Sequence, residues 1–286
     1  MKTNLRKDIK DFLMGVDAEL VLYTPSGKIA PLHGGIGEPM GYDGHAAVNR
    51  ISEVRTIPSG NPEELINSIR TAFVKKVQKH PIVLKYNWQA GSFKNYGIGA
   101  HLHHNVPSKV IDYQTLTLVI GNYVGALSLA LEDKKEAISR RNEGYGRLSD
   151  WRPQKWGMEV RCCSSFLTSP SVSIAHIALF KVVLYELLNN KSWSPKSRFS
   201  DLDFQTANQE KVRANFDSIW SEITQMGLYK KYKEYLDIFP FLINNSLTWF
   251  PKDADVKTAW GIADKTIPVS DTVSLTDIWK KSKEIF

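Results

Sequence analysis

The sequence contains little cysteine. Its 286 residues include two cysteines, Cys162 and Cys163, which are neighbours in the chain. A disulfide between adjacent residues would be badly strained, so we expect both thiols to be reduced and half buried in a strand. A cysteine nucleophile is the chemical alternative. The two cysteines therefore cannot form a disulfide framework.

Signals for membranes and export are missing as well. No apolar run reaches the roughly 20 residues that a membrane-spanning helix needs. The first 15 residues, MKTNLRKDIKDFLMG, lack the apolar centre and the small-residue cleavage site of a signal peptide. We therefore expect a cytoplasmic protein that does not enter a membrane.

Common nucleotide-binding motifs and repeats are also absent. The glycine-rich stretch HGGIGEPMGYDGH, residues 33–45, matches neither the dinucleotide-binding pattern nor a P-loop. No internal repeat or low-complexity tract appears. With 42% hydrophobic and 23% charged residues, the composition is that of a globular protein. The length allows one large domain, or a domain with an appendage.

The charge balance is basic. A formal net charge of +7 favours anionic partners such as nucleotides, acidic peptides or nucleic acid. The basic residues fall mainly in amphipathic stretches, such as RTAFVKKVQKH and EDKKEAISRRNEGYGR, where a solvated helix face is the usual explanation. No nucleic-acid recognition motif accompanies them, so nucleic-acid binding is an alternative that we do not favour.

Hydrophobic periodicity and turn residues predict a mixed fold. A hairpin is expected over residues 14–32, turning at Pro25-Ser26-Gly27. The segment from Asn61 to residue 77 is typical of a helix with an asparagine N-cap and proline in its first turn. Further strands are expected over 51–59, 81–88, 97–106 and 158–166, and helices over 113–137, 173–189, 208–227 and 229–239, with a loop over 140–157.

Three histidines fall within five positions of the stretch GIGAHLHHN, residues 97–105. If this segment is a strand, His101 and His103 lie on one face and His104 on the other, because strand side chains alternate. The pair is either a solvated strand end or a metal or phosphate site.

Carboxylates flanked by apolar residues recur along the predicted strands. Several such acids facing inward would repel one another unless cations neutralised them. Oxygen ligands combined with an imidazole suit Mg²⁺ or Mn²⁺. The acids concerned are Asp17, Glu19, Asp43, Glu53 and Glu159.

Arginines stand beside these acids in the sequence, at Arg55, Arg147, Arg152 and Arg161. The guanidinium fork binds phosphate and carboxylate with two hydrogen bonds, and phosphoryl transfer needs both a divalent metal and such donors. Some of these arginines could instead pair with neighbouring glutamates. The combined pattern favours a nucleotide-dependent enzyme.

Sequence blocks in a fixed order resemble a known family. DAEL, DGH, SEVRTIPSGNPEEL, GAHLHHN and ALEDKKEAISRRNEGYGRLSDWRPQKWGMEVRCCSSFLTSP follow the order found in phage-type carboxylate-amine ligases, the amidoligases. That family is similar in turn to glutamate-cysteine ligase and, more distantly, to glutamine synthetase. The resemblance covers about residues 12–185 and is densest over 145–170.

The resemblance implies an α+β fold in which a curved antiparallel sheet lines the active site and helices pack on it. Residues 1–190 would form the catalytic domain, and residues 191–286 a helical C-terminal subdomain packed on it. The implied reaction uses ATP and Mg²⁺, or Mn²⁺, to phosphorylate a substrate carboxylate. An amine then attacks the acyl phosphate to give an amide.

The resemblance also implies roles for individual residues. The metal ligands would be Asp17, Glu19, Glu53, His101 and Glu159. The cofactor-binding residues would be His101, His103, Arg147, Arg152 and Arg161. The catalytic residues would be Arg161, Glu53 and Glu159. Arg55 and Asp43 match the family's blocks less closely, and the first acidic motif begins with Asp where many relatives have Glu.

The implied partners are an amine and a carboxylate carried by a small molecule, a peptide or a protein side chain. A phage origin would place the enzyme in the host cytoplasm. Two alternatives belong to other classes: a protein that binds or modifies nucleic acid through its basic surface, and a catalytically dead ligase-like protein that serves in interactions.

Overall fold

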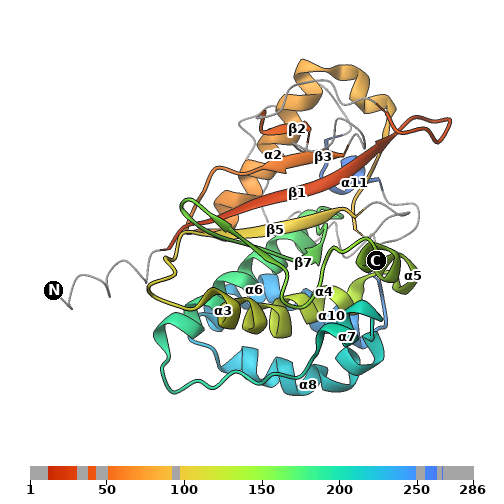
Figure 1. Ribbon diagram of the computed structural model, residues 1–286. Coiled ribbons are helices and arrows are strands. Elements are labelled where there is room, and N and C mark those ends of the chain that lie inside the picture. The colour runs from red at the N-terminus through yellow and green to blue at the C-terminus, as the bar shows by residue number, and fades with distance from the viewer. Residues whose placement is uncertain are drawn as a thin grey trace.

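A seven-stranded antiparallel sheet forms the centre of the described part of the protein (Figure 1). The computed structural model describes residues 12–30, 38–42, 51–91, 97–248, 255–262 and 266. The strand order is β2-β3-β1-β5-β7-β6, and β4 pairs with the end of β1. The strands are β1 Met14–Tyr23, β2 Met40–Tyr42, β3 Ser52–Arg55, β4 Asn87–Gln89, β5 Gly99–His104, β6 Trp151–Gln154 and β7 Gly157–Ser164.

The long central strand β1 has two chemically different faces. Val16, Ala18 and Leu20 are buried in the main hydrophobic cluster. Asp17 and Glu19 alternate with them and point to the opposite side. Because β3 and β5 pair with β1 in register, their side chains sort onto the same two faces. The sheet therefore has one apolar face and one face that carries charged residues.

Helices cover the apolar face of the sheet, and Figure 1 shows α3, α4 and α6 beside β5 and β7 with α8 beyond them. α6 is apolar almost throughout and packs against both α2 and α9. The helical segments are α2 Pro62–Lys79, η1 Pro81–Lys85, α3 Tyr113–Ile120, η2 Gly121–Gly125, α4 Ala126–Leu131, α5 Lys134–Asn142, α6 Pro170–Asn189, α7 Asp201–Gln205, α8 Gln209–Gln225, α9 Tyr229–Leu236, α10 Ile238–Asn244 and α11 Val256–Ala259.

The predicted helix over residues 113–137 is interrupted in two places. A five-residue π-helical segment, η2, separates α3 from α4. The chain then becomes extended at Glu132, and Asp133 caps a new helix, α5, by accepting a hydrogen bond from the Glu136 backbone N–H. The prediction of one continuous helix was wrong because Asp133 is a strong N-cap residue inside an apparently continuous pattern.

Two other predicted segments also differ from the structure. Residues 81–85 form a 3-10 helix that begins at Pro81, so only residues 87 and 88 of the predicted strand 81–88 lie in a strand, β4, which continues to Gln89. Residues 151–154, predicted as part of a loop, form strand β6. By contrast, the Asn61 cap of α2 and the turn after β1 are confirmed, the latter by the hydrogen bond from Gly27 N to Thr24 O.

Two helical stretches are long and apolar enough to cross a membrane by length and composition alone. They are Tyr113–Leu131 and Pro170–Asn189, and 83% of the apolar window of each is buried inside the protein. Neither stretch is an uninterrupted apolar run of about 20 residues, because polar residues interrupt both. Their burial against the sheet and other helices is that of core helices.

The helices after residue 190 contact the rest of the protein through specific side chains. Trp260 Nε1 donates to Leu167 O at 2.7 Å, and Arg213 Nη2 donates to Ala130 O at 2.8 Å. The α+β class with an antiparallel sheet is confirmed, whereas the boundary at residue 190 stays a prediction. Asp43 and most of the glycine-rich stretch lie outside the described residues.

Candidate active site

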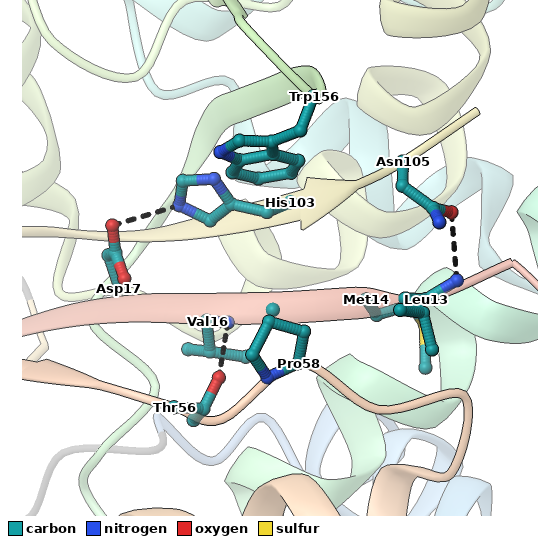
Figure 2. Close-up of a pocket in the computed structure, with 10 residues that line it drawn as sticks. Leu13, Met14, Val16, Asp17, Thr56, Pro58, His103, Asn105 and Trp156 are labelled. Atoms are coloured by element: carbon teal, nitrogen blue, oxygen red, sulfur yellow. Dashed lines mark hydrogen bonds and ion pairs between the residues drawn. The ribbon is translucent and has the colours of Figure 1, made fainter. Parts of the chain in front are cut away.

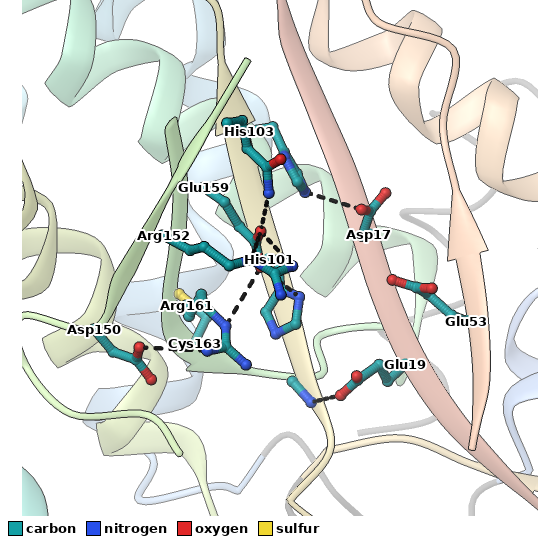
Figure 3. Close-up of polar contacts among 12 residues, drawn as sticks. Asp17, Glu19, Glu53, His101, His103, Asp150, Arg152, Glu159, Arg161 and Cys163 are labelled. Atoms are coloured by element: carbon teal, nitrogen blue, oxygen red, sulfur yellow. Dashed lines mark hydrogen bonds and ion pairs between the residues drawn. The ribbon is translucent and has the colours of Figure 1, made fainter. Parts of the chain in front are cut away.

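A strip of charged side chains runs across one face of the sheet (Figure 3). Carboxylates project from β1 and β3 on one side, the two imidazoles project from β5, and guanidiniums flank a glutamate on β6 and β7. We refer to this set as the polar strip. Its members are Asp17, Glu19, Glu53, Arg55, His101, His103, Arg152, Gln154, Glu159 and Arg161.

Two buried carboxylates lie directly opposite each other on the acidic side of the polar strip. Glu19 on β1 pairs in register with Glu53 on β3, and both residues are buried. Gly99 N donates to Glu19 Oε2 at 2.6 Å, and Arg55 forms an ion pair with Glu53. Like charges opposite each other on neighbouring strands destabilise a sheet unless a cation compensates them. This donor set therefore suits a divalent cation in addition to Arg55.

His101 and His103 lie on the same face of β5, as strand alternation predicts. His101 Nδ1 lies 3.2 Å from Glu159 Oε1, and His103 Nε2 lies 3.1 Å from Asp17 Oδ2. Burial, together with the positive charge of Arg161, holds the pKa of His101 well below its ordinary value. His101 is therefore a neutral imidazole at neutral pH, the form that binds metals.

Glu159 is the most heavily bonded member of the polar strip. Arg152 Nε donates to Glu159 Oε2 at 2.8 Å, and Arg152 Nη2 lies 2.7 Å from the same oxygen. Gln154 Nε2 also donates to Glu159 Oε2, at 2.6 Å. The other oxygen, Oε1, lies 3.4 Å from Arg161 Nε. The Glu159 side chain is fully buried, so these cations stabilise its charge in a site with little water.

Arg161 is held from two further directions. Its guanidinium lies over the Tyr145 ring, with Cζ 5.5 Å from the ring centroid, and its Nη1 lies 3.8 Å from Asp150 Oδ1. Tyr145 itself approaches very close to Gly97, where a side-chain carbon would meet the ring at 2.5 Å. The glycine in this sequence block therefore leaves room for the ring that supports Arg161.

Gly99, the first residue of β5, also keeps space open. A side-chain carbon there would lie 2.9 Å from Arg140 Nη2 and 3.2 Å from His101 Nε2. Arg140 is buried and donates from Nε to Ile98 O at 2.8 Å and from Nη2 to Cys163 O at 2.9 Å. These bonds attach α5 to the strands that carry the polar strip.

The remaining predicted residues lie apart from the centre of the strip. Arg147 is exposed in the loop before β6. His104 faces the core, where burial lowers its pKa to about 3, and its ring packs against Tyr113. Cys162 and Cys163 are free and fully buried rather than half buried, and the hydrogen bond between the two thiols together with burial raises the pKa of Cys162.

Several contributors were missed from the sequence. Gln154 shares a face with Arg152 because both lie on β6, and the alternation would have revealed it had residues 151–154 been recognised as a strand. Asp150, Tyr145 and Arg140 carry no such local signal, since each reaches the site from a loop or a helix. Among the described residues, no three His, Cys, Asp or Glu side chains converge closely enough to hold a metal ion as they stand.

Comparisons with solved structures and curated proteins bear on the fold. Among solved structures, the protein is similar to a chain in the complex between the prokaryotic ubiquitin-like protein Pup and its ligase PafA. The TM-score is 0.57 and the identity 9%, and the match covers 97% of this chain and 73% of that one. A bifunctional glutathione synthetase from Pasteurella multocida matches with a TM-score of 0.45 and 12% identity, covering 90% of this chain and 49% of that one. A search of curated proteins finds no significant match.

The family model covers most of the chain, including every strand and helix described above. Residues 14–262 match the model described as "Phage phiEco32-like COOH.NH2 ligase-type 2". The likeness to PafA supports the fold alone, because the identity is low. The chain belongs to the phage phiEco32-like COOH.NH2 ligase family, and it is a carboxylate-amine ligase, an enzyme that forms amide bonds.

Proposed function

We propose that the enzyme uses ATP and Mg²⁺ to convert a substrate carboxylate into an acyl phosphate, which an amine then attacks. The observation that carries this proposal is the separation of charge along the polar strip. Buried carboxylates lie opposite each other on β1 and β3, while guanidiniums converge on Glu159 at β6 and β7. Phosphoryl transfer needs both kinds of group, cation-binding acids and donors to phosphate, in one site.

The acidic side of the strip would hold the divalent cation, Mg²⁺ or Mn²⁺. Glu19 and Glu53 are the best placed, since they are buried register partners, and Asp17 lies next to Glu19 on the same face of β1. His101 and Glu159 would complete the ligand set from β5 and β7 once they moved toward these acids, since no three such side chains of the described residues converge on a metal position as they stand. A bound cation would neutralise the ATP phosphates, which would otherwise repel the incoming carboxylate.

The basic side would bind the transferring phosphoryl group and the acid substrate. Arg161 is the strongest candidate for stabilising the phosphoryl group, because Tyr145 and Asp150 hold its guanidinium in place. Arg152 has a side chain that is half exposed, so it can reach a ligand above the strip. His103 would contact the cofactor from β5, and the exposed Arg147 would bind phosphate or carboxylate from its loop.

The chemistry balances with these groups. A carboxylate oxygen attacks the γ-phosphorus and ADP leaves, which turns a poor acyl donor into a good one. The amine nitrogen then attacks the acyl carbon and inorganic phosphate leaves. The amine must first lose a proton, which a carboxylate of the polar strip can accept. The acid is carried by a small molecule, a peptide or a protein side chain, and the reaction takes place in the cytoplasm.

The direct test measures ADP release from Mg²⁺-ATP by the purified protein. Pools of amino acids, peptides and polyamines are supplied together and singly, and Glu53→Gln runs alongside as the variant that lacks one buried acid. We expect release that needs both an acid and an amine and that falls at least a hundredfold in the variant. Release that is equal in the variant, or that needs no acid, would contradict the proposal.

A further inference from the structure

We infer that a pocket beside the polar strip binds the carbon skeleton of the amine donor, and that this donor is a cationic or neutral amine with an apolar or aromatic group. This inference rests on the proposed function. The pocket has a volume of about 300 Å³ and lies where the start of β1 meets the segment after β3 and the turn between β6 and β7 (Figure 2). It is lined by Leu13, Met14, Gly15, Val16, Asp17, Thr56, Pro58, His103, Asn105 and Trp156.

The walls of the pocket are mainly apolar. Figure 2 shows the Trp156 ring above His103 and Pro58 on the opposite side. The Trp156 and His103 ring centroids lie 5.2 Å apart, although Trp156 is 51% exposed. A large aromatic side chain left half exposed beside a cavity is available for a ligand. The volume suits a group the size of an amino-acid side chain.

The polar groups of the pocket are largely committed to the backbone. Thr56 Oγ1 accepts a hydrogen bond from Val16 N at 2.8 Å, and Asn105 Oδ1 accepts one from Leu13 N at 2.9 Å. These bonds fix the two segments that form the walls. The pocket therefore offers shape and apolar surface rather than a dense set of hydrogen-bonding groups.

The charge of the pocket selects among the three ligands of the reaction. No lysine or arginine occurs among its described lining residues, and its charged group is the Asp17 carboxylate, 30% exposed and 3.1 Å from His103. Of the guanidiniums of the polar strip, Arg152 and Arg161 lie on β6 and β7. Arg55 is the register partner of Asp17 on β3, but it is paired with Glu53 and donates to Tyr42 O at 2.9 Å. An anion is disfavoured beside Asp17, whereas an ammonium group is attracted to it.

The pocket also lies within reach of the reacting groups. His103 forms one of its walls and is the register partner of Glu159, while Asp17 forms the edge nearest the buried acids. An amine whose carbon skeleton fills the pocket would direct its nitrogen past Asp17 onto the polar strip. This orientation is the one that attack on an acyl phosphate on the strip requires.

Gly15 provides a way to fill the pocket without breaking the strand. It lies opposite His103 in the β1–β5 register, and a side-chain carbon there would lie 3.5 Å from His103 Cβ and 3.9 Å from Thr56 Oγ1. Both distances are ordinary van der Waals contacts. Gly15→Ala and Gly15→Val should therefore fold while occupying increasing shares of the cavity.

The first experiment measures binding without ATP by isothermal titration calorimetry. The probes are phenylalaninamide, phenylalanine, ethylamine and adenosine. We expect phenylalaninamide to bind at least tenfold more tightly than ethylamine, which lacks the aromatic group, and than phenylalanine, which has a carboxylate in place of the amide. Gly15→Val should weaken phenylalaninamide binding at least tenfold, and the affinity of Gly15→Ala should lie between those of the wild type and Gly15→Val.

The control variant is Phe241→Ala, which removes an exposed aromatic ring from α10 in the helical layer and should leave binding unchanged. Circular dichroism and the melting temperature of each variant report folding. Unaltered phenylalaninamide binding in Gly15→Val would overturn the inference. Loss of adenosine binding in that variant, with phenylalaninamide unaffected, would also overturn it and assign the pocket to the nucleotide base.

The turnover assay separates this inference from the proposed function. In the active enzyme, Gly15→Val should raise the KM for an apolar amine at least tenfold and change the KM for ATP less than twofold. If no acid and amine pair elicits ADP release from the wild type, the proposed function fails while the calorimetric result still decides what the pocket binds.

Discussion

Replacing Glu159 with glutamine removes the charge of this side chain and keeps its shape. The carboxylate is fully buried and is contacted by Arg152, Gln154, His101 and Arg161. A glutamine oxygen in the Oε2 position can keep the bonds from Arg152 and Gln154. Its amide nitrogen would then face Arg161 Nε, a donor, across the 3.4 Å now spanned by the carboxylate.

The cost in stability follows from these contacts. Two bonds from Arg152 lose their charge-assisted part, worth about 1 kcal/mol each, and solvent around the half-exposed Arg152 reduces that to roughly 1 kcal/mol in total. The glutamine amide N–H group, which faces the N–H group of Arg161 Nε, adds about 1 kcal/mol to the loss of stability. We expect the free energy of unfolding to fall by about 2 kcal/mol, and the melting temperature by about 4–8 °C.

The cost in turnover is larger, because Glu159 is a proposed metal ligand and orients Arg161. We expect ADP release to fall at least a hundredfold, which corresponds to about 2.7 kcal/mol of activation free energy. The assay is coupled ADP release at a temperature where circular dichroism shows the variant folded. Urea unfolding measures stability in parallel.

Glu132→Gln is the matched control. Glu132 forms a fully buried ion pair with Arg141, at 2.8 Å and 3.1 Å, on the helical side of the protein. Neutralising it leaves a buried cation uncompensated and should cost about 3–5 kcal/mol of stability. Turnover per folded molecule should nevertheless remain close to wild type. Equal losses of turnover in the two variants would refute a specific role for Glu159.

Two further predictions concern buried groups outside the polar strip. Burial lowers the pKa of His176 to about 4, so the neutral ring should make its full contribution to the free energy of unfolding above about pH 6.5. That contribution should be lost as the pH falls toward 4, with a loss of about 2 kcal/mol at about pH 5. The free energy of unfolding of His176→Phe, measured in urea, should fall less steeply below about pH 6.5 than that of the wild type. An equally steep fall would contradict this assignment. Cys162 and Cys163 are both buried, so a thiol reagent should label neither within minutes in the native protein and both in urea; rapid native labelling would contradict their packing.

The strand alternation in the sequence was enough to predict which residues share a face. Asp17 and Glu19, His101 and His103, and Glu159 and Arg161 are each two residues apart, so each pair points the same way in any strand. The family resemblance then indicated that these strands belong to one sheet. Local spacing could not supply the register that places Glu19 opposite Glu53 or His103 opposite Glu159.

The parts that the sequence did not predict depend on contacts between distant segments. Arg140 lies on α5 but bonds to carbonyls of β7, and nothing in its neighbourhood indicates that reach. The pocket combines four stretches that are far apart in the sequence: the start of β1, the segment around Pro58, the end of β5 at His103 and Asn105, and Trp156 from the β6–β7 turn. Such a cavity exists only once the strands have paired.

The most direct test of the central claim follows oxygen from the acid substrate. The carboxylates of the acid pool that supports turnover are labelled with ¹⁸O, and the inorganic phosphate released with ADP is analysed by mass spectrometry. An acyl phosphate requires one labelled oxygen to pass from the carboxylate to the phosphate for each amide formed. We predict that transfer, in a one-to-one ratio with ADP. Amide formation with unlabelled phosphate would contradict the mechanism.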